Sequence, residues 1–289
     1  MSQTKTVLAL IGKGKWGQNY IKTISQSDDW VLPPENIKTT DYADLFSKKI
    51  DGIIIATPTP THFQIASDFL KKGFNILIEK PITKTYQQAI KLHKIAFQHP
   101  KQIVMAGHIQ LYNPGYSLFK SLLSKIGSIQ TLKYYGLQSP TRIDATLIED
   151  WGAHPTYLFK DILRQEPQSV KAEKGKQKQV KLTYCYKNNI IGIAHIAWLS
   201  KIKKRQLVVR GNTATLIFDD LNKTISLIKD SHLSVFQVNL QFSPLTQELK
   251  EFVSAIEKKR QPKSNIIQAV SVMKILQQFA RSLTNTGNL

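Results

Sequence analysis

The sequence places three glycines where a polyphosphate could lie against the main chain. Residues 12–17 read GKGKWG, so Gly12, Gly14 and Gly17 follow a G-x-G-x-x-G spacing, directly after an apolar run and before a helical pattern. In that setting the first glycine makes a tight turn, the second lets the backbone approach a pyrophosphate, and the third allows a helix to pack closely on a strand. The alternative interpretation is a glycine-rich turn that binds no ligand.

A lysine stands at the end of another apolar run. Residues 74–81 read FNILIEKP, so the run ends in Glu79, Lys80 and Pro81. A strand that is apolar on both faces is buried, and we therefore expect Lys80 to be partly buried at its end. The alternative is a lysine that merely ends a strand and reaches into solvent.

An acid and a histidine recur at helical spacing in the second half of the chain. Asp150 and His154 lie four residues apart in DWGAH, which places two side chains on one face of a helix. Pro155 is tolerated only in the first turn of a helix, so it predicts that the helix begins near His154. The alternative is an aspartate N-cap followed by a surface histidine.

Short apolar runs alternate with helical patterns over the first hundred residues. The runs cover residues 6–12, 52–58, 74–81 and 102–108. Strands that are apolar on both faces and separated by helices predict a doubly wound α/β fold, with a parallel sheet covered on both sides. Small or chemically active residues follow the strands, at the edge where such sheets bind ligands.

The second strand of this expected sheet is poorly marked. A dinucleotide-binding fold carries an acid about twenty residues after the glycines, at the end of its second strand, where it bonds the ribose hydroxyls. Glu35 and Asn36 fall near that distance, but two prolines precede them and neither follows a convincing strand. The choice between NAD and NADP therefore stays open. Lys13 and Lys15 could attract an extra phosphate, although lysine is frequent throughout the chain.

The pattern changes near residue 108. Residues 113–127 predict a helix with Asn113 as N-cap and Pro114 at its first position. Later stretches alternate β-branched and aromatic residues around Asn-Asn and Gly-Asn turns, which predicts antiparallel strands, and two amphipathic helices follow. We therefore predict an NAD(P)-binding Rossmann domain over residues 1–108 and a second, α+β domain over residues 109–289, for substrate binding and oligomerisation.

The charge of the chain is unusual, but it does not indicate nucleic-acid binding. The formal net charge is +20 and the pI is about 9.8. Lysine outnumbers arginine, and the densest basic stretches, residues 171–181 and 201–205, are not interleaved with aromatic residues that could stack on bases. We predict no nucleic-acid partner and expect a field that attracts anionic small molecules.

Several other functional classes are excluded by composition. Cys185 is the single cysteine, so the chain has no disulfide framework, which fits a reducing compartment. The first apolar run is too short for a signal peptide, and no later run approaches a membrane span. The seven histidines are dispersed without metal-ligand spacing. We therefore predict a cytoplasmic protein with no membrane partner and no metal site.

Taken together, these stretches resemble the Gfo/Idh/MocA oxidoreductase family, named for glucose-fructose oxidoreductase and inositol dehydrogenase. The similarity runs through ALIGKGKWGQNY, IIIATP, EKP, YNP, DWGAH and LTQELKEFVSAIEKKRQP and covers nearly the whole chain. Its most specific part is the block from IIIATP through EKP, followed by YNP. The chain is most similar to the branch that acts on nucleotide-linked sugars. The resemblance implies a Rossmann domain followed by an α+β domain with a large, open, mostly antiparallel sheet.

The resemblance also implies a set of cofactor and catalytic residues. Lys80 would lie beside the nicotinamide, before a cis Lys-Pro bond, where an ammonium stabilises alkoxide character on the substrate. His154 would act as acid or base, because the ordinary pKa of a histidine side chain lies near neutrality, and Asp150 would share the site. The implied cofactor-binding residues are Gly12, Gly14, Lys15, Trp16, Gly17, Thr57, Pro58, His62, Glu79 and Lys80.

On the substrate side the resemblance implies Tyr112, Asn113 and Arg142, whereas Trp198 is expected in the core. The expected function is an NAD(P)-dependent oxidoreductase that moves a hydride between nicotinamide and a secondary hydroxyl or ketone of a sugar or nucleotide-linked sugar. We expect a homo-dimer or homo-tetramer, because an open sheet face with apolar residues seeks cover. The alternative is a catalytically silent descendant that acts as a binding or assembly protein.

Overall fold

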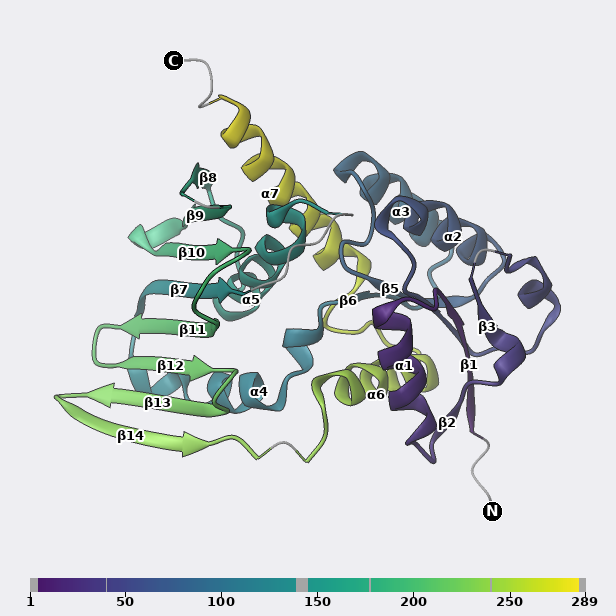
Figure 1. Cartoon of the computed structure of the whole chain (residues 1–289), viewed down its shortest axis with the longest axis horizontal. Helices are drawn as coiled ribbons and strands as arrows, with labels where there is room; N and C mark the ends of the chain where they lie inside the picture. The colour runs from purple at the N-terminus through teal and green to yellow at the C-terminus, as the bar shows by residue number, and fades with distance from the viewer. Residues whose placement is uncertain (1–4, 40, 139–144, 177, 240, 286–289) are drawn as a thin grey trace. The chain divides into compact units, whose positions relative to one another are not determined.

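The computed structural model describes residues 5–39, 41–138, 145–176, 178–239 and 241–285. The chain folds into two compact units, Met1–Ile109 with Pro244–Met273, and Gln110–Ser243 with Lys274–Leu289. Each unit is built on its own sheet (Figure 1).

The first unit contains the parallel sheet that the sequence predicts. Its strands follow the order β2-β1-β4-β5-β6, and β3 also pairs with β1. The apolar residues of β4 are fully buried, because helices α2 and α3 cover one face of the sheet while α1 and α6 pack together on the other (Figure 1). The strands are β1 Thr6–Ile11, β2 Trp30–Val31, β3 Ile37–Lys38, β4 Gly52–Ile55, β5 Asn75–Glu79 and β6 Val104–Gly107. The helices are α1 Lys15–Ser25, α2 Thr59–Lys71, α3 Tyr86–Gln98 and α6 Pro244–Glu257.

The poorly marked second strand is present as two fragments. β2 and β3 contain two residues each, and both pair in parallel with β1. A 3₁₀ helix, Pro34–Asn36, separates them. Proline lacks the N–H that a sheet requires, so Pro33 and Pro34 prevent one continuous strand here.

The grouping of helix α6 differs from the domain division that the sequence suggested. That division assigned everything after residue 108 to the second domain, whereas residues 244–273 belong to the first compact unit. The physical reason is packing, because Phe252 of α6 lies against Gly52 at the start of β4, where any side chain would collide with its ring. A contact between residues so far apart in sequence leaves no local signal.

The second unit contains the large sheet that the resemblance implies. Its eight strands follow the order β14-β13-β12-β11-β7-β10-β9-β8, and every pair is antiparallel except β7 with β10. The strands are β7 Ile129–Leu137, β8 Ser169–Lys174, β9 Gln179–Cys185, β10 Ile191–Ala197, β11 Lys204–Gly211, β12 Thr215–Asp219, β13 Thr224–Lys229 and β14 His232–Gln237. The fold class predicted from the sequence is thus confirmed.

Helices cover one face of this sheet. Helix α4, Pro114–Ser121, contacts β12 and β13, and Phe159 of helix α5, Ala153–Leu163, packs on Gly192 of β10. The first part of helix α7, Ile266–Asn285, belongs to the first unit and its last part to the second, where Phe279 meets Tyr184 with ring centroids 4.9 Å apart.

The α-helix that carries His154 begins at Ala153, close to where the sequence predicts it. A π-helical turn, Ile148–Gly152, runs directly into this helix. Pro155 is tolerated because it occupies the first turn of α5.

The other face of the second sheet carries exposed apolar side chains. They include Ile191 of β10, Ile228 of β13, and Leu233 and Val235 of β14. The expected homo-dimer or homo-tetramer stays a prediction. In the part of the chain that the structure describes, none of the helices combines the length and apolarity needed to cross a bilayer.

Candidate active site

The glycine turn of the first unit is open where a phosphate would approach. Gly12 follows β1 with φ of +111°, and a side chain there would collide with the carbonyl of Ala56. A side chain at Gly17 would collide with the carbonyl of Gly12. Gly14 is different, because a Cβ built on it would meet no atom within 4 Å. The first and third glycines are therefore required by packing, while the second leaves its backbone accessible.

The start of helix α1 is suited to an anion. Gly14 is its N-cap and makes no side-chain cap bond, and the first turn contains no acidic residue. Lys15 is exposed and Trp16 is half-buried at this end. The amide groups and the helix dipole favour a negative charge here, so the residues present fit the diphosphate of a dinucleotide. Contact of Lys15 and Trp16 with the cofactor stays a prediction.

The second strand of the sheet ends in a lysine, where a dinucleotide-binding fold would have an acid. Strand β3 ends at Lys38, whose carbonyl accepts the Gly12 N–H at 2.8 Å, so it lies beside the glycine turn. Glu35 lies in the preceding 3₁₀ helix, and Asn36 is buried with its amide bonded to the Leu8 carbonyl. Neither therefore stands at the end of the strand, where an acid would meet a ribose.

Two strand ends of the first unit are tied together by a buried histidine. The His62 ring bonds with the carbonyl of Thr57, after β4, and with the carbonyl of Pro81, after β5, at 2.8 Å each. Lys80 is only 8% exposed, and the Lys80-Pro81 peptide is cis, as the resemblance implies. Pro58 is exposed as the N-cap of α2. The structure thus brings Thr57, His62 and Lys80 to the same edge of the sheet.

Glu79 belongs to a buried acidic pair that the sequence did not reveal. Its Oε2 accepts the Lys80 N–H at 3.1 Å, and its Oε1 accepts the Tyr20 hydroxyl at 2.9 Å. Glu248 of α6 is fully buried on the far side of that hydroxyl, at 3.4 Å. Burial and the charge of Glu79 raise the pKa of Glu248 well above its usual value, so Glu248 holds its proton. These residues are separated by up to 228 positions, which explains why no motif contains them.

His108 is a neutral histidine near Lys80. It follows β6, is 3% exposed, and its Nδ1 bonds with Gln268 Oε1 at 2.7 Å. Burial lowers the pKa of His108 to about 3; the bond to Gln268 opposes the shift and the charge of Lys80 adds to it. His108 therefore contributes no charge to this edge at neutral pH.

The second unit holds the acid and the histidine of DWGAH. Asp150 is 7% exposed, and its Oδ2 accepts the indole N–H of Trp198 at 3.2 Å. His154 is half-buried, and its Nδ1 bonds with the Tyr157 hydroxyl at 2.6 Å. Trp198 is in the core as expected, but it also positions Asp150, and neither this role nor that of Tyr157 was predicted from the sequence. The sequence signal that could have revealed both roles is the residue type, because a buried indole N–H or phenol hydroxyl needs a hydrogen-bond partner.

The residues predicted on the substrate side have different surroundings. Asn113 is the expected N-cap of α4, because its Oδ1 accepts the Gly115 N–H at 2.9 Å. Its amide donates to Gln110 and to Asp220, and the residue is 1% exposed. Tyr112 is also buried. Contact of either with a substrate stays a prediction, and Arg142 lies outside the described residues.

Comparison with known proteins agrees with this arrangement. Residues 33–108 match the Gfo/Idh/MocA oxidoreductase family, described as having an NAD-binding Rossmann fold. A solved structure of an oxidoreductase from Magnetospirillum magnetotacticum is 26% identical, with a TM-score of 0.84 over 96% of this chain and 100% of that one. Over residues 33–108 the chain is thus similar to the Gfo/Idh/MocA family, as its sequence motifs suggested.

The curated relatives of this chain match only part of it. The UDP-N-acetylglucosamine 3-dehydrogenase of Acidithiobacillus ferrooxidans is 30% identical over 132 residues, which are 45% of this chain and 41% of that protein. The 2,7-anhydro-N-acetylneuraminate hydratase of Mediterraneibacter gnavus is 29% identical over 136 residues, 42% of this chain and 36% of that protein. The matches thus span less than half the length of these relatives.

Proposed function

We propose that this chain is a member of the Gfo/Idh/MocA family and an NAD(P)-dependent oxidoreductase that acts on a secondary hydroxyl or ketone of a sugar or nucleotide-linked sugar. The observation that carries the proposal is the open backbone at Gly14, at the start of α1, in the same unit as the buried Lys80. A relative named as a dehydrogenase of a nucleotide-linked sugar supports the substrate class.

The side chains have distinct roles in this proposal. A bound nicotinamide would supply the hydride acceptor or donor. His154 takes the proton of the substrate hydroxyl in the oxidative direction, and we assign this transfer to Nε2 because Nδ1 bonds with Tyr157. Lys80 stabilises negative charge on a substrate oxygen. Asp150, held by Trp198, orients the histidine or the substrate.

We further propose that the cofactor is NADP. An acid at the end of the second strand selects NAD by bonding the ribose hydroxyls, whereas a cation there accommodates a 2′-phosphate. Lys38 occupies this place beside the glycine turn. Asp44 pairs with Lys38 at 2.7 Å and with Lys48 at 3.6 Å, so the cluster carries one net positive charge.

Titration with NADPH and NADH, followed by nicotinamide fluorescence, tests the cofactor assignment. We expect NADPH to bind about tenfold more tightly, the equivalent of one charge-assisted hydrogen bond. Lys38→Glu should reverse the preference, and Lys49→Glu, at an exposed neighbouring lysine, should leave it unchanged. Tighter binding of NADH to the native chain would contradict the assignment of NADP, and binding of neither would contradict the oxidoreductase.

Turnover with UDP- and dTDP-linked sugars tests the catalytic roles. Lys80→Met and His154→Ala should each abolish turnover with little change in NADPH affinity. Lys84→Met and His232→Ala are matched controls, because Lys84 is an exposed lysine close to Lys80 in sequence and His232 lies exposed on β14. Unchanged turnover in Lys80→Met or His154→Ala would show that the role assigned to that residue is wrong.

A further inference from the structure

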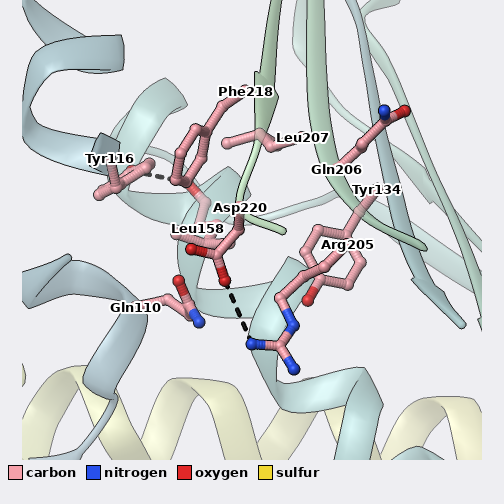
Figure 2. A pocket seen from close by; sticks show the side chains of 9 residues that line it. All are labelled: Gln110, Tyr116, Tyr134, Leu158, Arg205, Gln206, Leu207, Phe218 and Asp220. Carbon is pink, nitrogen blue, oxygen red and sulfur yellow. Dashed lines mark hydrogen bonds and ion pairs between the residues drawn. The ribbon is translucent and has the colours of Figure 1, made fainter. Parts of the chain in front are cut away.

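The second unit has a small pocket that the proposed chemistry does not use (Figure 2). Its enclosed room is only about 10 Å³, enough for one oxygen-sized group, and the empty space of about 250 Å³ includes the open solvent in front of it. Apolar walls come from Leu158, Leu207 and Phe218, and the polar lining includes Tyr134 on β7 and Arg205 on β11. A pocket with apolar walls and a few convergent polar groups is typical of a small-molecule site.

The guanidinium of Arg205 is held in place on two sides. Its Nη1 donates to Asp220 Oδ2 at 3.2 Å, and its central carbon lies 5.5 Å from the centre of the Trp151 ring. Gly136 makes room for this stacking, because a side chain there would collide with the rings of both Trp151 and Tyr134. Among the described residues, Asp220 is the one that accepts a hydrogen bond from the guanidinium of Arg205. The other guanidinium donors are therefore available to a ligand, in a fixed orientation.

The ion-pair cluster of Asp220, Arg205 and Lys223 carries one excess positive charge. Asp220 is 6% exposed and pairs with Arg205 and, at 3.0 Å, with Lys223. Burial alone would raise the pKa of Asp220, but the bonds from Lys223 and Asn113 and the charge of Arg205 outweigh it and lower the pKa. Asp220 is thus ionised, and one carboxylate faces two cations.

The hydroxyl of Tyr134 is the second observation that indicates a ligand. Tyr134 is 3% exposed, and its hydroxyl has no hydrogen-bond partner in the described part of the chain. Burial raises its pKa, so the group keeps its proton and can donate. A buried donor without a partner is costly, and native structures rarely keep one unless something else satisfies it.

The pocket adjoins the candidate acid–base residues of the same unit. The Trp151 ring contacts both Arg205 and His154, and its centroid lies 5.4 Å from that of the His154 ring. The charge of Asp150 also reaches Tyr134. The Trp151 ring therefore lies between Arg205 of the pocket and His154, the proposed acid–base residue.

We infer that Arg205 and the Tyr134 hydroxyl bind an oxyanion of the substrate, a carboxylate or a phosphate, and that the substrate is therefore an acidic sugar. Arginine presents several donors in a plane to such a group, and the phenol adds one more. That the acidic group belongs to the reacting sugar rests on the proposed function. The anion binding itself rests on the pocket alone.

Calorimetric titration of the full chain with D-glucose, D-glucuronate and D-glucose 1-phosphate tests the inference. At least one of the two anions should bind about tenfold or more tightly than glucose, since a charge-assisted bond is gained. The anion that does so identifies the source of the oxyanion. Tyr134→Phe and Arg205→Met should each remove the difference.

Two controls keep the test decisive. Tyr184→Phe removes a buried hydroxyl outside the pocket and should preserve the preference for the anion. Arg205→Met removes a partner of Asp220, and thermal melting shows whether this variant still folds. If it does not fold, the binding of the anions to Tyr134→Phe tests the inference. Equal binding of glucose and both anions would overturn the inference, as would a preference that survives Tyr134→Phe. Nicotinamide fluorescence on the same samples reports separately on the proposed function.

Discussion

Replacing Glu248 by glutamine should change how stability depends on pH. Glu248 is fully buried beside Glu79, and its Oε1 has no hydrogen-bond partner in the described ranges. Burial and the charge of Glu79 raise its pKa above the usual 4.5. In the unfolded chain the same group ionises near that usual value, so above it the folded protein keeps a proton that the unfolded chain has lost.

The magnitude follows from this difference of one proton. Below pH 4.5 both states are protonated and the contribution of Glu248 to stability is fully present. As the pH rises from there toward the folded-state pKa, the free energy of unfolding falls by up to about 1.4 kcal/mol per pH unit. For a domain of 150–250 residues this corresponds to roughly 3–6 °C in Tm per unit. Glu248→Gln cannot ionise, so its stability advantage over the native chain should grow by this amount.

Urea or thermal unfolding at pH 5, 6 and 7 measures the effect, with Glu251→Gln as control. Glu251 also lies on α6; burial would raise its pKa, but the bonds and charge of Arg260 and a backbone bond from Lys263 lower it. Its ionised form therefore stabilises the fold above its usual pKa, and Glu251→Gln should destabilise the protein at pH 7. Parallel pH dependences for Glu248→Gln and the native chain would refute the reasoning, as would a less stable Glu248→Gln protein at pH 7.

Three further substitutions test other contacts. Trp198→Phe removes the donor to Asp150, so turnover should fall about tenfold while NADPH affinity, followed by fluorescence, stays unchanged; an equal loss of affinity would contradict the positioning role. Asn113→Ala removes the cap of α4 and a bond to Asp220, and urea unfolding should show a loss of about 1–3 kcal/mol; an unchanged midpoint would contradict the capping role. Glu79→Gln removes the charge beside Lys80 and should lower turnover, whereas turnover equal to that of the native chain would show that this charge does not act on Lys80.

Local patterns predicted the parts of this fold that depend on neighbours in sequence. The spacing of Gly12, Gly14 and Gly17 was sufficient to predict the glycine turn, because the surroundings of these residues are local. Gly12 lies against Ala56 at the end of the adjacent strand, Gly17 lies against Gly12, and Gly14 faces open space. Asn113 before Pro114 predicted a helix start, and the structure has it there. The apolar runs predicted a parallel sheet because buried strands need no polar face.

Contacts between distant residues could not be predicted in the same way. Helix α6 joins the first unit through Phe252 and Gly52, and a helix pattern does not reveal which sheet it will cover. Trp198 looked like a core residue because an apolar strand position does not disclose that the indole N–H meets Asp150. Periodicity reports which face of an element is buried, but not the partner on the other side.

The buried groups next to Lys80 limit the number of negative charges at this strand end. Tyr20 has a single hydroxyl proton, and it lies 2.9 Å from Glu79 but 3.4 Å from Glu248. Glu79 therefore receives the hydrogen bond that favours an ionised carboxylate, while Glu248, with one oxygen unbonded, keeps its own proton. His108 is neutral because burial lowers its pKa. With Glu248 protonated, the acidic pair carries at most one negative charge at neutral pH, and that charge lies on Glu79, whose carboxylate accepts the Lys80 N–H.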